Sequence, residues 1–205
     1  MNEIPDFLIQ KLEMQYGKEL AQNITIGYQY KRPVTLRINT LKISVQQIKE
    51  ILTQLQIPYH EVAWCKEALI LQNVRENTIR ELDIYKNGEI YLQSLSSMLP
   101  PIILKPKPNV DILDMAAAPG GKTSQLAAIT NNQAHITACE VNKIRLQRLK
   151  YNIQKQGATS VYIMEKDARQ LDDYFSFNQI LLDAPCSGAG TLYVKNPKLQ
   201  EVFTR

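Results

Sequence analysis

The chain has 205 residues, 44% hydrophobic and 21% charged, a composition typical of globular proteins that build a sizeable core. Its formal net charge of +4 permits an RNA partner without indicating one. Three cysteines without a C-x-x-C motif and two isolated histidines argue against a disulfide framework and a zinc site, so we expect no metal. Because the sequence has neither a signal-peptide pattern nor a run of about 18 apolar residues, we expect a cytoplasmic protein without a membrane span.

The first half of the sequence predicts helices followed by a small α+β module. Residues 1–32 have the apolar spacing of helices, with Gly17 as a break between two of them. Residues 33–72 contain strand patterns at 34–38, 59–64 and 68–72, and a helix that Ser44 can cap. Residues 73–108 are predicted to form a connector, with a tight turn at Asn87-Gly88, followed by a strand end and a short helix in YLQSLSSMLPP before the next domain.

From residue 109 onward, strand patterns alternate with helix patterns. We expect strands at 110–115, 135–140, 161–166 and 179–184, separated by two longer helices and by a short helix after Asp167. This alternation predicts right-handed β-α-β crossovers and a mostly parallel sheet, which is an α/β fold. Ligands of such sheets bind beyond the carboxyl ends of the strands.

Carboxylates stand at those strand ends. Asp114, Glu140 and Asp183 end the first, second and fourth strands, and Asp167 follows the third, so we expect them to line one rim of the sheet. Glu140 lies where dinucleotide-binding folds carry the acid that binds the ribose hydroxyls. The alternative is that Glu140 is a solvated carboxylate that caps a helix.

The stretch AAAPGGKT at 116–123 predicts a tight ligand-binding turn after the first strand. It lacks a glycine at Ala116, which a triphosphate-binding loop requires, and no G-x-G-x-x-G motif for a nicotinamide cofactor is present. Pro119-Gly120-Gly121 still lets the backbone bend sharply and approach a ligand closely. A glycine turn with a ribose-binding acid but no phosphate pattern fits S-adenosylmethionine, which has a ribose and no phosphates.

The second chemical signal is LLDAPCSGAGTL at 181–192, after the fourth strand. Methyltransferases that act on exocyclic amines usually have two prolines after the acid, whereas here Cys186 replaces the second one. A thiolate suits methylation of C5 of a pyrimidine, because its addition at C6 turns C5 into a nucleophile. The alternative is that Cys186 is an inert small residue.

Together these motifs resemble the Nop/Sun family of RNA (cytosine-5)-methyltransferases. ILDMAAAPGGKTSQLA resembles the family's cofactor turn, LLDAPCSGAGTL its catalytic loop, and LRINTLKIS its RNA-positioning module; the similarity covers roughly residues 33–195. The resemblance implies a Rossmann-like class I methyltransferase domain at 109–205, comprising the front half of its parallel sheet, with the RNA-positioning module at 33–72. It also implies S-adenosylmethionine as the cofactor and ribosomal or transfer RNA as the substrate.

The resemblance further implies roles for single residues. Glu140 would bind the ribose hydroxyls, Asp167 would lie near the adenine, and Asp183 would lie between cofactor and base. Lys122 and Asp183 would hold the flipped-out cytosine, although Lys122 could instead reach from the helix start into solvent. The backbone expected to cradle the methionine part of the cofactor belongs to Ala116, Ala117, Ala118, Pro119, Gly120, Gly121 and Lys122.

The resemblance breaks down after Cys186. Family members carry their nucleophilic cysteine in a Thr-Cys motif after a fifth strand, and the cysteine that matches Cys186 helps to release the product. No Thr-Cys motif occurs between Cys186 and Arg205, and a sheet that stopped at residues 179–183 would expose an apolar edge. We therefore expect the chain to be the front part of a longer or truncated protein, inactive alone. Cys186 could act alone as the nucleophile, as its counterpart does in related DNA enzymes.

Two further alternatives remain open. A chain without its catalytic end could be a non-catalytic RNA- or S-adenosylmethionine-binding protein, whereas the leading module and Pro185-Cys186 disfavour a small-molecule methyltransferase. In addition, the helix at 142–156 has five basic residues and no acids, with Arg145, Arg148 and Lys155 on one face. This face is either solvated or in contact with RNA phosphates.

Overall fold

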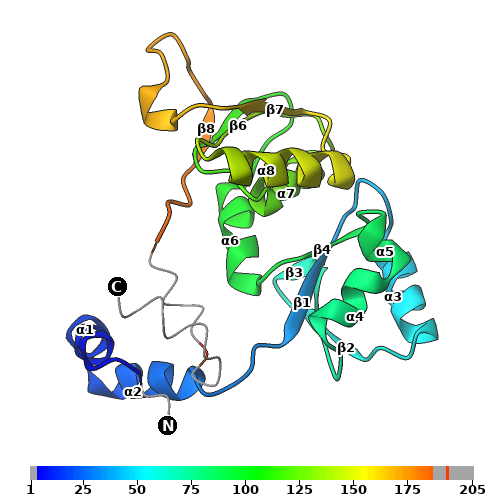
Figure 1. Ribbon diagram of the computed structural model, residues 1–205. Coiled ribbons are helices and arrows are strands. Elements are labelled where there is room, and N and C mark those ends of the chain that lie inside the picture. Colours follow the sequence, from blue (N-terminus) through cyan, green and yellow to red (C-terminus); the bar gives the residue numbers. More distant parts are fainter. Residues whose placement is uncertain (1–3, 187–192, 194–205) are drawn as a thin grey trace. The chain divides into compact units, whose positions relative to one another are not determined.

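The computed structural model describes residues 4–186 and 193, and the chain divides into two units (Figure 1). The first unit comprises residues 1–32 and 186–205, and the second comprises 33–185. In the first unit, α1 (Asp6–Tyr16) and α2 (Lys18–Gly27) pack through Leu8, Leu12 and Ala21. The predicted helix pair with its break at Gly17 is thereby confirmed.

The second unit begins with an antiparallel sheet of order β2-β3-β1-β4. Its elements are β1 (Val34–Ile38), α3 (Val45–Gln54), β2 (Tyr59–Val62), β3 (Cys65–Leu71), α4 (Glu76–Glu81), α5 (Asp83–Lys86) and β4 (Ile90–Leu92). Ser44 caps α3 as expected, because its side chain accepts a hydrogen bond from the Gln47 N–H and the Gln47 side chain accepts one from the Ser44 N–H. β4 pairs with β1 although it lies in the segment assigned to a connector, so the sheet extends beyond residue 72.

A parallel sheet of order β7-β6-β5-β8 follows, which confirms the predicted α/β fold. Its elements are α6 (Leu95–Leu104), β5 (Asp111–Asp114), α7 (Gly121–Ile129), β6 (His135–Cys139), α8 (Lys143–Gln156), β7 (Val161–Met164), the short 3-10 helix η1 (Ala168–Gln170) and β8 (Gln179–Leu181). α7 and α8 lie on the same side of this sheet (Figure 1) and bury Leu126, Leu146 and Leu149 against it. The strand order reverses between β5 and β8, and this switch point is where such sheets bind ligands.

Buried hydrogen bonds join the first sheet to the end of α8. The Asn39 side chain donates to the carbonyl oxygens of Gly88 at 2.8 Å and of Gln156 at 2.7 Å. Gly88 has a φ of +72°, and a Cβ at this position would lie 2.2 Å from the Lys155 carbonyl oxygen. Only glycine therefore fits the predicted turn at Asn87-Gly88, which rests directly on the end of α8.

β8 lies at one edge of the parallel sheet among the described residues. Ile180 and Leu182, at and just after this strand, are 52% and 61% exposed. Within residues 4–186, no helix is long and apolar enough to cross a membrane.

Candidate cofactor and base site

Asp114 fixes the start of the site. It is buried at the end of β5, and its Oδ2 accepts a hydrogen bond from Thr123 Oγ1 at 2.7 Å. Burial raises the pKa of Asp114 to about 6, although hydrogen bonds from Thr123 and the Ala116 N–H and the nearby charge of Lys122 oppose the rise. The carboxyl group thus ties the strand to the first turn of α7.

The turn between β5 and α7 is held from outside by side chains. Three of its carbonyl oxygens accept hydrogen bonds at 2.8–2.9 Å: Ala118 from Arg145, Pro119 from Asn152, and Gly121 from Arg37. The first turn of a helix leaves its N–H groups without intrahelical acceptors. The N–H groups at the start of α7 are therefore available to a ligand, while the carbonyl groups of the turn are already occupied.

Gly120 explains why the turn needs glycine. Its φ is +103°, and a Cβ there would lie 3.0 Å from Leu149 Cδ1 on α8. A side chain at Gly120 would combine backbone strain with a steric clash. Glycine at this position lets the turn pack directly on α8, and this packing places the start of α7 next to the switch point between β5 and β8.

Glu140 is buried at the end of β6, with 4% of its side chain exposed. Its Oε1 accepts a hydrogen bond from the Asn142 N–H at 2.8 Å, and its Oε2 lies 3.5 Å from Arg145 Nε. The alternative of a solvated carboxylate is therefore wrong. Arg145 contacts both Glu140 and Ala118, so it links the acid to the turn and is not part of a freely solvated helix face.

Lys122 and Asp183 come together across the switch point. Lys122 Nζ lies 2.5 Å from Asp183 Oδ2, which joins the start of α7 to the segment after β8. The Lys122 side chain is only 20% exposed, so the alternative that it reaches into solvent is wrong. A cation donor and a carboxylate acceptor thus lie side by side near Asp114.

Asp167 caps η1 just after β7. Its carboxylate accepts hydrogen bonds from the backbone N–H and the guanidinium of Arg169, and these bonds lower the pKa of Asp167 to about 2. The carboxylate is ionised at neutral pH, and Asp167 lies at the same edge of the sheet as Glu140, because both residues follow the carboxyl ends of neighbouring parallel strands.

Cys186 is not part of the second unit, so its role in the site stays a prediction. Cys186 is exposed and belongs to the first unit, so the site of the second unit is described without it. Residues 187–192 of the expected catalytic loop, and the chain end where a Thr-Cys motif was sought, lie outside the described residues. Cys65 and Cys139 are buried, and burial raises the pKa of both thiols.

Sequence reasoning missed Arg37. The alternation of β1 would place Arg37 on the solvent face, opposite Leu36 and Ile38, yet Arg37 is buried. Its guanidinium donates to the Gly121 carbonyl and to Ser124 Oγ, each at 2.9 Å, and lies over the Tyr91 ring. Burial lowers the pKa of Arg37 to about 10. No local signal could reveal this role, because α7 is 84 residues away in the sequence.

Two family models match the chain. The model described as 16S rRNA methyltransferase RsmB/F matches residues 101–202, and the model described as Methyltr_RsmF/B-like, ferredoxin-like domain matches residues 4–76. The chain is 38% identical over 201 residues to Ribosomal RNA small subunit methyltransferase F of Shewanella loihica, a match that covers 94% of this chain and 41% of the relative. It is 34% identical over 204 residues to 25S rRNA (cytosine-C(5))-methyltransferase nop2 of Schizosaccharomyces pombe, covering 96% and 33%.

A solved structure gives the same result. A methyltransferase homologue from Pyrococcus horikoshii has 33% identity and a TM-score of 0.77, covering 98% of this chain and 69% of that chain. The chain spans between a third and about two fifths of the length of the two curated relatives. The expected Rossmann-like methyltransferase fold is confirmed, and this chain belongs to the RsmB/F (Nop/Sun) family of RNA methyltransferases.

Proposed function

We propose that this chain forms the cofactor- and base-binding part of an S-adenosylmethionine-dependent enzyme that methylates C5 of cytosine in ribosomal RNA. The Lys122–Asp183 pair at the switch point, next to the glycine turn, is the observation that carries the proposal. The curated relatives support the reaction, since one is a small-subunit ribosomal RNA methyltransferase and the other a 25S rRNA cytosine-C5 methyltransferase. A cytoplasmic location stays a prediction.

The residues present fit S-adenosylmethionine, which would supply the methyl group. The free N–H groups at the start of α7 suit the carboxylate of its methionine part, because helix N-termini favour anions. Glu140 is buried, and its oxygens retain lone pairs for two ribose hydroxyls. We further propose that the backbone of residues 116–122 cradles the methionine part and that Asp167 lies beside the adenine.

Lys122 and Asp183 would recognise the base. The polar edge of cytosine has acceptor atoms at O2 and N3 and a donor amino group at N4, which the ammonium and carboxylate groups can match. A base inside a duplex cannot reach such a site, so the cytosine must be unpaired or flipped out. Cys186 stays a predicted participant, either in attack on C6 or in product release.

Calorimetric titration of the 205-residue chain with S-adenosylmethionine tests the proposal. We expect Glu140→Ala to weaken binding about 10-fold or more, because hydrogen bonds to a charged group contribute about 1.5–3 kcal/mol. The matched control is Glu165→Ala, which removes an exposed acid from the same region and should leave the affinity unchanged. Circular dichroism would verify that both variants fold, and a folded wild-type chain that fails to bind S-adenosylmethionine would contradict the cofactor assignment.

A further inference from the structure

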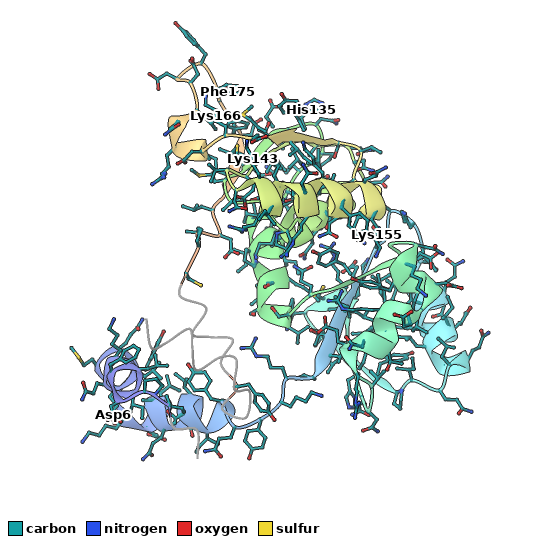
Figure 2. The ribbon with its side chains drawn as sticks, viewed as in Figure 1. Asp6, His135, Lys143, Lys155, Lys166 and Phe175 are labelled. Atoms are coloured by element: carbon teal, nitrogen blue, oxygen red, sulfur yellow. The ribbon has the colours of Figure 1, made fainter. Side chains whose placement is uncertain are left out.

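A cavity of about 640 Å³ lies between α8 and the segment that contains α4, α5 and β4, outside the site described above. Its volume is within the range of about 300–1,000 Å³ that is typical of small-ligand pockets. Lys155 lies at the end of α8 that borders it, whereas Lys143 lies at the other end (Figure 2). The basic and aromatic residues that line the cavity are Arg80, Tyr85, Tyr91, Arg148, Tyr151 and Lys155.

The cavity contains cations without a neutralising acid in its wall. None of its lining residues is acidic. Burial lowers the pKa of Lys155, and repulsion from Arg80 and Lys42 lowers it further. Arg80 pairs with Glu76 outside the cavity, but Arg148 makes no ion pair within the part of the chain that the structure describes. An anion bound here would relieve this repulsion.

The tyrosines give the cavity planar apolar surfaces. Lys155 Nζ lies 3.8 Å from the centroid of the Tyr85 ring and 5.7 Å from that of Tyr151. Tyr151 is 62% exposed, so the ring is accessible to a ligand. Aromatic side chains beside cations form the arrangement on which proteins stack the bases of single-stranded nucleic acids.

We propose that this cavity binds one nucleotide of single-stranded RNA, with its base stacked on Tyr151 and its phosphate between Arg148 and Lys155. The proposal rests on the proposed function, because it names how the RNA substrate is held outside the site of methyl transfer. The cavity also adjoins the cofactor turn: Asn152, in its wall, donates to the Pro119 carbonyl at 2.8 Å. RNA bound here would contact β4 of the first sheet and α8 at once.

Fluorescence anisotropy with the full 205-residue chain and a short fluorescein-labelled oligouridine tests the cavity. We expect Tyr151→Ala to weaken binding about 5- to 150-fold, since one base loses its stacking partner, and Tyr151→Phe to retain the affinity. Arg148→Gln should lower the slope of log K against log salt concentration by about 0.7, the value for one phosphate contact to a single strand.

Lys150→Gln is the matched control. Lys150 is exposed on the same helix, does not line the cavity, and lies two residues from Arg148, hence on nearly the opposite side of α8. If Lys150→Gln and Arg148→Gln weaken binding equally while Tyr151→Ala changes nothing, the contact is only a diffuse charge effect and the proposal fails. It also fails if a polyglutamate peptide displaces the RNA from wild type but not from Arg148→Gln, because the cavity would then favour an acidic protein segment.

Titration with S-adenosylmethionine separates this proposal from the proposed function. The Tyr151 and Arg148 variants should bind the cofactor as wild type does, because neither side chain belongs to the cofactor site. Unchanged RNA affinity in these variants, with cofactor binding intact, would overturn the cavity alone. Absence of cofactor binding in the folded wild-type chain would instead overturn the proposed function.

Discussion

The glycine turn at 116–121 and the strand end at 179–183 belong to the two most specific motifs of the sequence, yet the structure supports these two segments very differently. Side chains of Arg37, Arg145 and Asn152 hold the turn through its carbonyl oxygens. In contrast, β8 is an edge strand among the described residues, its Ile180 is exposed, and the ion pair of Asp183 with Lys122 links the segment after β8 to α7. A segment with a highly specific sequence motif is therefore not always fixed firmly by the rest of the fold.

The largest expected effect comes from removing the support of the turn at Arg37. Arg37→Met keeps the apolar stem but removes the guanidinium that donates to the Gly121 carbonyl and to Ser124 Oγ, which should destabilise the fold by about 3–4 kcal/mol. Urea denaturation would measure the loss. As a control, Arg32→Met changes an exposed arginine outside the second unit and should alter stability by less than about 0.5 kcal/mol. Equal effects of the two variants would show that the turn does not depend on the buried guanidinium.

The contact of Asp114 with the first turn of α7 can be tested through the pH dependence of stability. Its folded-state pKa of about 6 exceeds the unfolded value, so the folded state binds the extra proton and stability falls as the pH rises from about 4 to about 7. The full difference amounts to about 3 kcal/mol at about 1.4 kcal/mol per pKa unit. The free energy of unfolding of Asp114→Asn, relative to that of wild type, should therefore rise by about 3 kcal/mol between about pH 4 and about pH 7. Denaturation at each pH would measure it. A constant difference between the two proteins would mean that Asp114 does not titrate there.

The smallest effect is expected at the strand edge. Ile180→Thr places a hydroxyl on a side chain that is 52% exposed and should change the free energy of unfolding by no more than about 0.5 kcal/mol. Ile136→Thr, on the central strand β6, buries that hydroxyl and should cost about 2 kcal/mol or more. Comparable losses of stability at both positions would show that the edge strand β8 is packed as tightly as the central strand β6.

Local patterns were sufficient for most of the fold. The alternation of Val34, Leu36 and Ile38 predicted β1, and the strand-helix alternation after residue 109 predicted the parallel sheet. The strand end that begins at residue 91 was expected, but it was not assigned to the first sheet, because its pairing with β1 is a long-range contact that a local pattern does not show.

The site was predictable only in its motifs. Asp114, Glu140 and Asp183 do stand at the strand ends where the sequence placed them. The side chains that hold these groups were not predictable, because Arg37 contacts α7 through tertiary packing. The sequence pattern of α8 indicates one continuous basic face, but two of its side chains have partners within the protein. Arg145 donates a hydrogen bond to the Ala118 carbonyl, and Lys155 packs on the Tyr85 ring.

The hydrogen bonds of Asn39 to Gly88 and Gln156 have a consequence for substrate choice. The Asn39 amide group fixes the first sheet to the end of α8, and α8 in turn packs against the glycine turn. Under the proposed function, these contacts would set the distance between an RNA strand bound at the first sheet and the site of methyl transfer. Selection among cytosines would then depend on the spacing along the RNA as much as on the bases around the target.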